Sequence, residues 1–348
     1  MYNIVDYLMY YKDISIDDVR WNYADNLLCA MLSYLPLDSF KGGVKLDKLY
    51  KMAESFKERD KNNPMAPESY KLLDIIKNSK RYEGLKVYNF VSYKNNEAQF
   101  GAVTFRIKGE TVISFMGTDY SLIGWFENFR LSYEYPTRTQ ALAISYLKEN
   151  VRLFENKNLY VCGHSKGGNL ALVSAMESPK HINSRIKKVY NFDGPGLRRE
   201  EFLSEKYKRI SERLVNIVPD GSVVGVLLDN ENFEVIKSES VAINKHNPMN
   251  WNMFGEFFVP SKLSSVSKQL HESSTNGLLK VSREERKKAF EAIFKSFEGE
   301  HSRDFQVSLT GIIKVYKNMK NIEPEAKKSI DAIVDAILKV QLFNKNKE

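Results

Sequence analysis

The chain has 348 residues, of which 43% are hydrophobic and 28% are charged, and its formal net charge is +8. This length and composition allow one enzyme-sized core with an accessory region, and they exclude a wholly disordered protein. Two cysteines in a chain this long exclude a disulfide framework and a cysteine-based zinc site, so we expect two buried thiols and no metal or other cofactor.

The sequence predicts a cytoplasmic protein with neither a signal peptide nor a transmembrane helix. No basic segment opens the chain, Asp6 and Lys12 interrupt its first apolar residues, and no run of about 18 uncharged apolar residues occurs. The positive charge is scattered over the predicted helices, which favours an ordinary solvated surface, with peripheral contact with an anionic membrane as the alternative. A nucleic-acid partner is not expected, because the sequence contains no zinc finger, aromatic RNA-binding pattern or basic recognition helix.

Hydrophobic periodicity predicts three successive regions. Residues 1–80 should form a helical N-terminal lead-in packed on the core, because apolar residues recur at helical spacing in 24–35, 46–56 and 70–76. Residues 81–260 should form an α/β core, and residues 261–348 a C-terminal helical region that could act as a cap or lid. In that last region, helices are expected from Ser282 to Phe297 and from Pro324 onward.

Within the core, short apolar and β-branched segments alternate with helical ones. Strands are expected at 85–91, 99–107, 111–116, 159–162, 188–192, 214–218 and 233–236, and helices at 122–129, 140–154 and 167–176. Such alternation is typical of a mostly parallel sheet with helices on both faces.

The segment Gly163-His164-Ser165-Lys166-Gly167-Gly168 lies between a predicted strand and a predicted helix. A Gly-x-Ser-x-Gly sequence in that context forms a nucleophile elbow, a tight turn that exposes the serine hydroxyl above the carboxyl edge of an α/β-hydrolase sheet. Ser165 is therefore the expected nucleophile, and the backbone NH of Lys166 an oxyanion donor. The alternatives are a phosphate-binding turn and a plain loop.

A serine nucleophile needs a base and an acid, which in this fold follow it in the order acid, then histidine. His246 lies in a loop after the last predicted strand and is the expected base; His181, His271 and His301 lie in helical or polar surroundings.

Asp220 directly follows the strand 214–218 and is the expected acid. Asp193, which ends the preceding strand, is the alternative, and Asp229 the third candidate. Thr118, at the end of the strand 111–116, is the expected second oxyanion donor through its NH and hydroxyl, unless this is an ordinary strand end.

Five segments together resemble the bacterial Mbeg1-like family, which is similar to the class 3 lipases; they are Phe115-Met116-Gly117-Thr118-Asp119, Gly124-Trp125-Phe126-Glu127-Asn128-Phe129, Gly163-His164-Ser165-Lys166-Gly167-Gly168-Asn169-Leu170-Ala171, Asn191-Phe192-Asp193-Gly194-Pro195-Gly196 and His246-Asn247-Pro248-Met249-Asn250-Trp251. The resemblance covers residues 1–260 and implies the same triad and oxyanion donors. Class 3 lipases usually have Leu and Arg where this chain has Lys166 and Met116, which weakens the inference about substrate.

The resulting hypothesis is a lipase- or esterase-like serine hydrolase that cleaves a carboxylic ester through Ser165, Asp220 and His246. A lipid or acyl-glycerol substrate is favoured by the lipase resemblance, and a thioester would suit the same machinery. The competing hypothesis is a non-catalytic binding or scaffold protein that keeps the fold.

Overall fold

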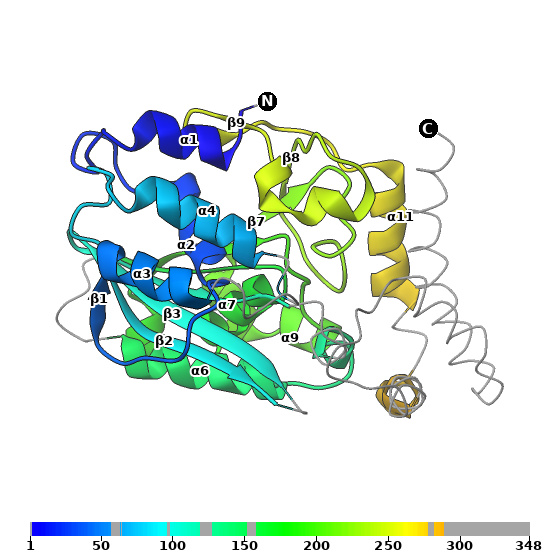
Figure 1. Cartoon of the computed structure of the whole chain (residues 1–348). Coiled ribbons are helices and arrows are strands. Elements are labelled where there is room, and N and C mark those ends of the chain that lie inside the picture. Colours follow the sequence, from blue (N-terminus) through cyan, green and yellow to red (C-terminus); the bar gives the residue numbers. More distant parts are fainter. Residues whose placement is uncertain are drawn as a thin grey trace.

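A computed structural model describes residues 2–56, 63, 65–95, 98–118, 127–151, 158–277 and 282–288. Within these residues the chain builds an eight-stranded sheet, flanked by helices, in which the strands lie side by side in the order of the sequence (Figure 1). The strands are β1 (Gly43–Lys45), β2 (Lys86–Lys94), β3 (Gln99–Ile107), β4 (Glu110–Phe115), β5 (Asn158–His164), β6 (Ile186–Phe192), β7 (Leu214–Pro219) and β8 (Phe233–Ile236).

The sheet changes from antiparallel to parallel at β4. Strands β1 to β4 pair antiparallel, and β4 to β8 pair parallel. The turn between β3 and β4 consists of Lys108 and Gly109, both with positive φ, which suits a two-residue hairpin. Parallel neighbours instead need long crossover connections, and those from β4 to β5, from β5 to β6 and from β6 to β7 carry helices. A separate short hairpin pairs β9 (Met253–Phe254) with β10 (Phe257–Phe258).

Among the described residues, four helices come before β2, and further helices lie between the parallel strands β4 to β7. Three begin with a reciprocal capping box at Asn3, Asn22 and Thr137, which explains where they start. The α-helices are α1 (Ile4–Tyr11), α2 (Tyr23–Leu32), α3 (Leu46–Phe56), α4 (Ala66–Ile76), α6 (Arg138–Asn150), α7 (Lys166–Met176), α8 (Lys180–Asn183), α9 (Arg199–Phe202), α10 (Glu205–Ser211) and α11 (Ser265–Glu272). Shorter helical turns are η1 (Ala242–His246), η2 (Pro248–Asn250) and η3 (Ser273–Gly277).

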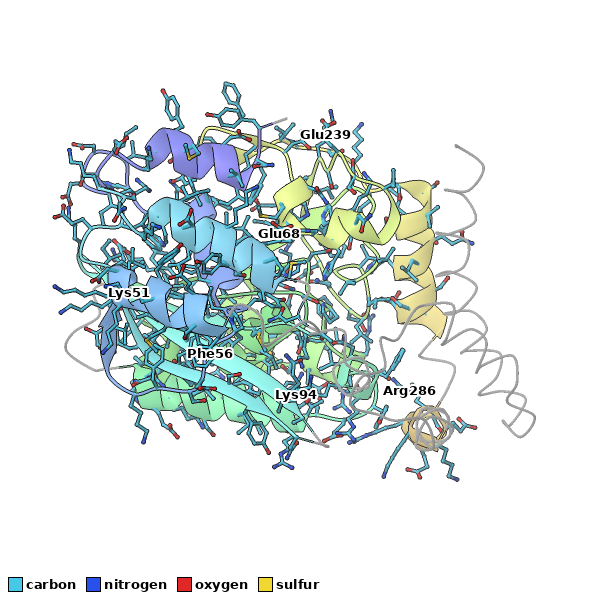
Figure 2. The ribbon with its side chains drawn as sticks, viewed as in Figure 1. Lys51, Phe56, Glu68, Lys94, Glu239 and Arg286 are labelled. Atoms are coloured by element: carbon cyan, nitrogen blue, oxygen red, sulfur yellow. The ribbon has the colours of Figure 1, made fainter. Side chains whose placement is uncertain are left out.

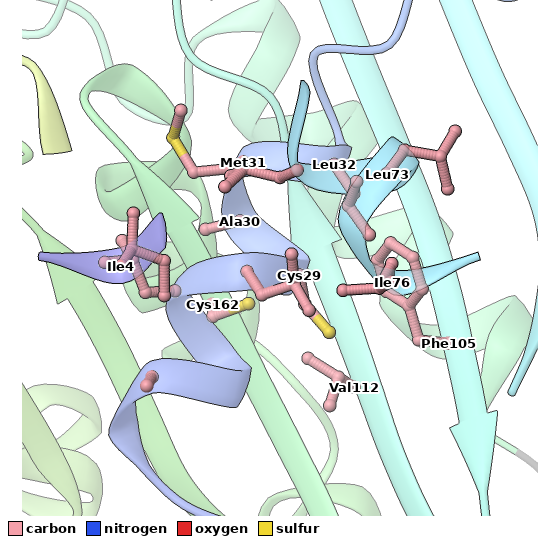
Figure 3. Close-up of a cluster of buried hydrophobic side chains, with 14 of the residues drawn as sticks. Ile4, Cys29, Ala30, Met31, Leu32, Leu73, Ile76, Phe105, Val112 and Cys162 are labelled. Carbon is pink, nitrogen blue, oxygen red and sulfur yellow. The ribbon is translucent and has the colours of Figure 1, made fainter. Parts of the chain in front are cut away.

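Two hydrophobic cores occupy the two faces of the sheet. Side chains of α1 to α4 form one core with Val112 and Cys162, and side chains of α6, α7 and α10 form the other with Ile113 and Val161. Neighbouring residues of one strand thus enter opposite cores, as the two-residue repeat of a strand requires. Figure 3 shows Cys29 of α2 beside Cys162 of β5 in the first core, and both thiols are free and buried, as predicted.

The predicted elements are largely confirmed. The three helices expected in residues 1–80 correspond to α2, α3 and α4, but that region also contains the edge strand β1, which was missed because three residues are too short for a recognisable alternation. Of the helix expected at 122–129 only the end is described, and the helices expected beyond residue 288 lie outside the described residues.

The C-terminal region begins with α11 and continues with a helical stretch at 283–288. Arg286 of this stretch, labelled in Figure 2, donates a hydrogen bond to the carbonyl of Ser132. None of the helices in the described ranges combines the length and the apolar character needed to cross a membrane. The sheet and its flanking helices confirm the predicted α/β-hydrolase fold.

Candidate active site

Ser165 occupies a strained turn between β5 and α7. Its backbone has φ 59° and ψ −135°, a region that non-glycine residues seldom adopt and that is characteristic of functional sites. Its NH donates to the carbonyl of Phe192 at the end of β6 (2.9 Å), and its carbonyl accepts from Gly168 (2.8 Å). These bonds on both sides of the turn stabilise the unusual backbone. The residue is 6% exposed.

The glycines of the turn are required by close backbone contacts. A Cβ on Gly163 would lie 2.2 Å from the carbonyl oxygen of Gly167, and a Cβ on Gly167 would lie 2.1 Å from that of Phe115. No side chain fits at either distance. The strand, turn and helix therefore have the geometry of a nucleophile elbow, as the spacing of the glycines predicted.

His246, at the end of η1, is paired with Asp193. Its Nδ1 lies 2.6 Å from Asp193 Oδ2, and the histidine side chain keeps 19% of its surface exposed while the carboxylate has none. The second carboxylate oxygen accepts from the Ser222 hydroxyl and from the NH of Gly225. Because a carboxylate can only accept here, Nδ1 carries a proton and Nε2 is the nitrogen left for chemistry.

Asp220 does not contact His246, so the expected pairing of these two residues is wrong in geometry. Its Oδ1 accepts from the Lys245 ammonium at 2.6 Å, and its Oδ2 from the Ser261 hydroxyl at 3.3 Å. Asp193 and Asp220 follow the neighbouring parallel strands β6 and β7, and Lys245 and His246 are adjacent in η1. The His246 imidazole contacts Asp193, and the Lys245 ammonium contacts Asp220. Asp229 pairs instead with Arg199 at 2.6 Å.

A second histidine joins the elbow to the loop that carries His246. The His164 ring lies 4.5 Å from the His246 ring, and its Nε2 lies 2.9 Å from the His246 carbonyl oxygen, while Nδ1 lies 3.0 Å from the hydroxyl of Tyr34. Burial, and next the repulsion that a protonated His164 would meet from a protonated His246, hold the pKa of His164 well below its usual value. A neutral ring that donates from Nε2 must accept at Nδ1, so Tyr34 donates.

The segment after β4 lies against the nucleophile. A Cβ on Gly117 would come within 2.9 Å of Ser165 Cβ, and the next residue, Thr118, has its hydroxyl 3.1 Å from the side-chain nitrogen of Asn128. Lys166 begins α7 directly after the serine, so its NH is one of the unpaired donors of the first helical turn. Of the two expected oxyanion donors, Lys166 thus follows Ser165 in the chain, and Thr118 follows a glycine that is packed against Ser165.

The side chain of Lys166 belongs to the site in a way that sequence reasoning missed. Its ammonium is fully buried and forms an ion pair of 2.6 Å with Glu127. It also donates to the backbone and side-chain oxygens of Gln99, at 2.8 Å and 3.2 Å. The only signal in the sequence is a lysine among the small and apolar residues that open this helix, and it does not identify the partners.

Of the expected residues, Ser165, His246, Thr118 and Lys166 come together at the carboxyl edge of β4 to β6, with Asp193 instead of Asp220. Within the part of the chain that the structure describes, no hydrogen bond joins the Ser165 hydroxyl to His246. Such bonds are often long in an unliganded enzyme and tighten with substrate. The described residues contain no group of three or more His, Cys, Asp or Glu side chains that could hold a metal ion.

Comparison with known proteins places the chain in a family. A search of curated proteins finds no match. Among solved structures, the crystal structure of M37 lipase is 16% identical, with a TM-score of 0.36, over 57% of this chain and 67% of that chain. The family model described as Mbeg1-like matches residues 76–295, more than half of the chain and including Ser165, Asp193 and His246, and the chain therefore belongs to the Mbeg1-like family.

Proposed function

We propose that this protein is a serine hydrolase that cleaves a carboxylic ester, with Ser165 as nucleophile, His246 as base and Asp193 as the acid that orients it. The observation that carries the proposal is the 2.6 Å bond between Asp193 and Nδ1 of His246 beside a serine in elbow geometry. This arrangement leaves Nε2 unprotonated and able to accept a proton from a hydroxyl.

The reaction proceeds through an acyl-enzyme. His246 Nε2 takes the proton of Ser165 as Oγ attacks the ester carbonyl, and the resulting oxyanion accepts hydrogen bonds from the NH groups of Thr118 and Lys166. The C–O bond of the ester then breaks, and His246 returns the proton to the departing alcohol. Water, deprotonated by the same nitrogen, hydrolyses the acyl-enzyme and regenerates the serine.

A lipid ester is the substrate class that we favour. The net charge of +8 suits contact with an anionic lipid surface, and the hairpin β9–β10, which follows the His246 loop, exposes Phe254 by 81% and Phe257 by 60%. Aromatic side chains of this kind insert readily at a lipid interface.

A fluorophosphonate probe tests the catalytic assignment. Wild-type protein should be labelled covalently and Ser165→Ala should not. Ser174→Ala is the matched control: this serine is buried on α7 and donates only to its own helix, so the variant should label like wild type. A folded wild-type protein that resists the probe would favour a non-catalytic scaffold instead.

A substrate panel then separates the ester classes. Chromogenic esters of increasing acyl length, the matching thioesters and vesicular phospholipids should be assayed beside Ser165→Ala. We expect faster hydrolysis of long-chain oxygen esters. Preference for thioesters would identify a thioesterase, and preference for acetyl esters would refute the lipid substrate while leaving the triad intact.

A further inference from the structure

The ammonium of Lys166 uses all three of its protons inside the protein. Its Nζ donates to Glu127 Oε2 and to two oxygens of Gln99, and the side chain has no exposed surface. An amine that is saturated in this way cannot act as an acid or base toward a substrate. Its contribution must come through the groups that it holds.

Those groups hold the segment after β4. The side-chain nitrogen of Gln99 donates to the carbonyl of Gly117 (3.3 Å), and the NH of Gln99 donates to Glu127 Oε2 (3.2 Å). Asn128, which follows Glu127 in the chain, donates to the hydroxyl of Thr118 (3.1 Å). Gly117 is therefore bonded to one partner of the buried ammonium, and Thr118 to the residue that follows its other partner.

We propose that Lys166 is a positioning residue whose side chain fixes the Gly117–Thr118 segment so that the NH of Thr118 meets the oxyanion. The inference rests on the proposed function, because an oxyanion forms only if Ser165 attacks a carbonyl. Lys166 thus stabilises the oxyanion in two ways: its own NH donates a hydrogen bond, and its side chain aligns the Gly117–Thr118 segment.

Charge balance explains why a buried lysine is compatible with this role. Glu127 neutralises the ammonium at 2.6 Å and is itself 2% exposed, so the pair adds no net charge behind the oxyanion. A lone buried ammonium or carboxylate would be strongly unfavourable, and the two residues are expected to be replaceable only together.

A positioning role and a purely structural role differ in what they change. An oxyanion exists only after attack, so misplacing its donors should lower kcat and leave KM nearly constant. A merely structural ion pair would instead lower thermal stability and leave kcat of the folded fraction unchanged.

The test uses the full-length protein and a chromogenic butyrate ester. Lys166→Met/Glu127→Leu removes both charges together, and Gln99→Met removes the link to Gly117 while it leaves the ion pair in place. Both should lower kcat by about 100-fold, the scale expected when reacting groups are displaced by roughly 1 Å, with KM within about twofold of wild type.

Lys206→Met is the matched control, because it removes a lysine that pairs with Glu177 on the helix pair α7 and α10, away from the triad, and it should leave kcat and KM unchanged. Circular dichroism establishes that each variant is folded; if the double variant is not, Gln99→Met decides. Folded variants with wild-type kcat, while wild type is active and labelled by the probe, overturn this inference alone. A folded wild type that neither hydrolyses esters nor reacts with the probe overturns both the inference and the proposed function.

Discussion

Exchanging each of two aspartates for asparagine separates the acid of the triad from its neighbour. Asparagine keeps the size of the side chain, so Asp193→Asn can still accept from Ser222 and Gly225 through its remaining oxygen. The new amide nitrogen, however, would take the place of Asp193 Oδ2, which lies 2.6 Å from His246 Nδ1, and would face the proton on Nδ1. The imidazole would then turn its proton to Nε2 and lose its basic nitrogen.

The expected effects differ by orders of magnitude. A wrong histidine tautomer in a serine triad costs about 10³- to 10⁴-fold in kcat, or roughly 4–5.5 kcal/mol in transition-state energy. Asp220→Asn removes the ion pair with Lys245, whose two side chains are 20% and 22% exposed. Ion pairs near the surface contribute about 0.2–1 kcal/mol to stability. Even if all of that energy were lost from the transition state, kcat would fall by no more than about fivefold.

The assay is steady-state hydrolysis of a chromogenic butyrate ester by wild type, Asp193→Asn and Asp220→Asn, with thermal unfolding of each protein as the folding control. Equal losses in the two variants would show that the Lys245 pair contributes to catalysis as much as the His246 pair. A larger loss in Asp220→Asn would refute the assignment of Asp193 and restore the acid expected from the sequence.

Three further substitutions test the packing of the fold and of the site. Arg81→Met should lower the free energy of unfolding by about 3–5 kcal/mol in denaturant titrations, because it leaves the Asp25 carboxylate buried without its cation at 2.6 Å; a loss below about 1 kcal/mol would contradict this. Gly167→Ala should lower the unfolding free energy by about 1–3 kcal/mol or prevent folding, since its Cβ would lie 2.1 Å from the last carbonyl oxygen of β4, and a wild-type melting temperature would refute the close packing. Tyr34→Phe should cost about 1–3 kcal/mol of stability by leaving Nδ1 of His164 without a donor, and unchanged unfolding would show that this bond contributes nothing.

The elbow and the strands β2 to β8 could be predicted because their signals are local. Gly163, Ser165 and Gly167 lie within five residues, and the strand before them and the helix after them have clear periodicity. His246 could be predicted because few histidines follow the nucleophile and only one lies in a loop after the last core strand. These inferences need chain order and spacing, and no knowledge of distant contacts.

The carboxylate that pairs with His246 and the partners of Lys166 could not be predicted, because tertiary geometry decides them. Asp193 and Asp220 both follow strands at the same edge of the sheet. They differ in backbone conformation: Asp193, directly after the last residue of β6, has a φ of 52°. Lys245, which precedes His246 in the chain, forms the ion pair with Asp220 instead. Glu127 lies 39 residues before Lys166 in the chain, and no periodicity connects them.

The elbow is the element to which the other parts of the site are attached. The NH of Ser165 binds the carbonyl before Asp193, its carbonyl leaves only 2.3 Å for a Cβ on Gly194, and His164 binds the backbone of His246. The segments around Ser165 are thus attached to the elbow, through backbone contacts at the end of β6 and through the His164 ring at His246. Because transition-state stabilisation depends on groups placed before the reaction begins, this arrangement is better explained by catalysis than by passive binding, which would not require a strained serine at the point where the segments meet.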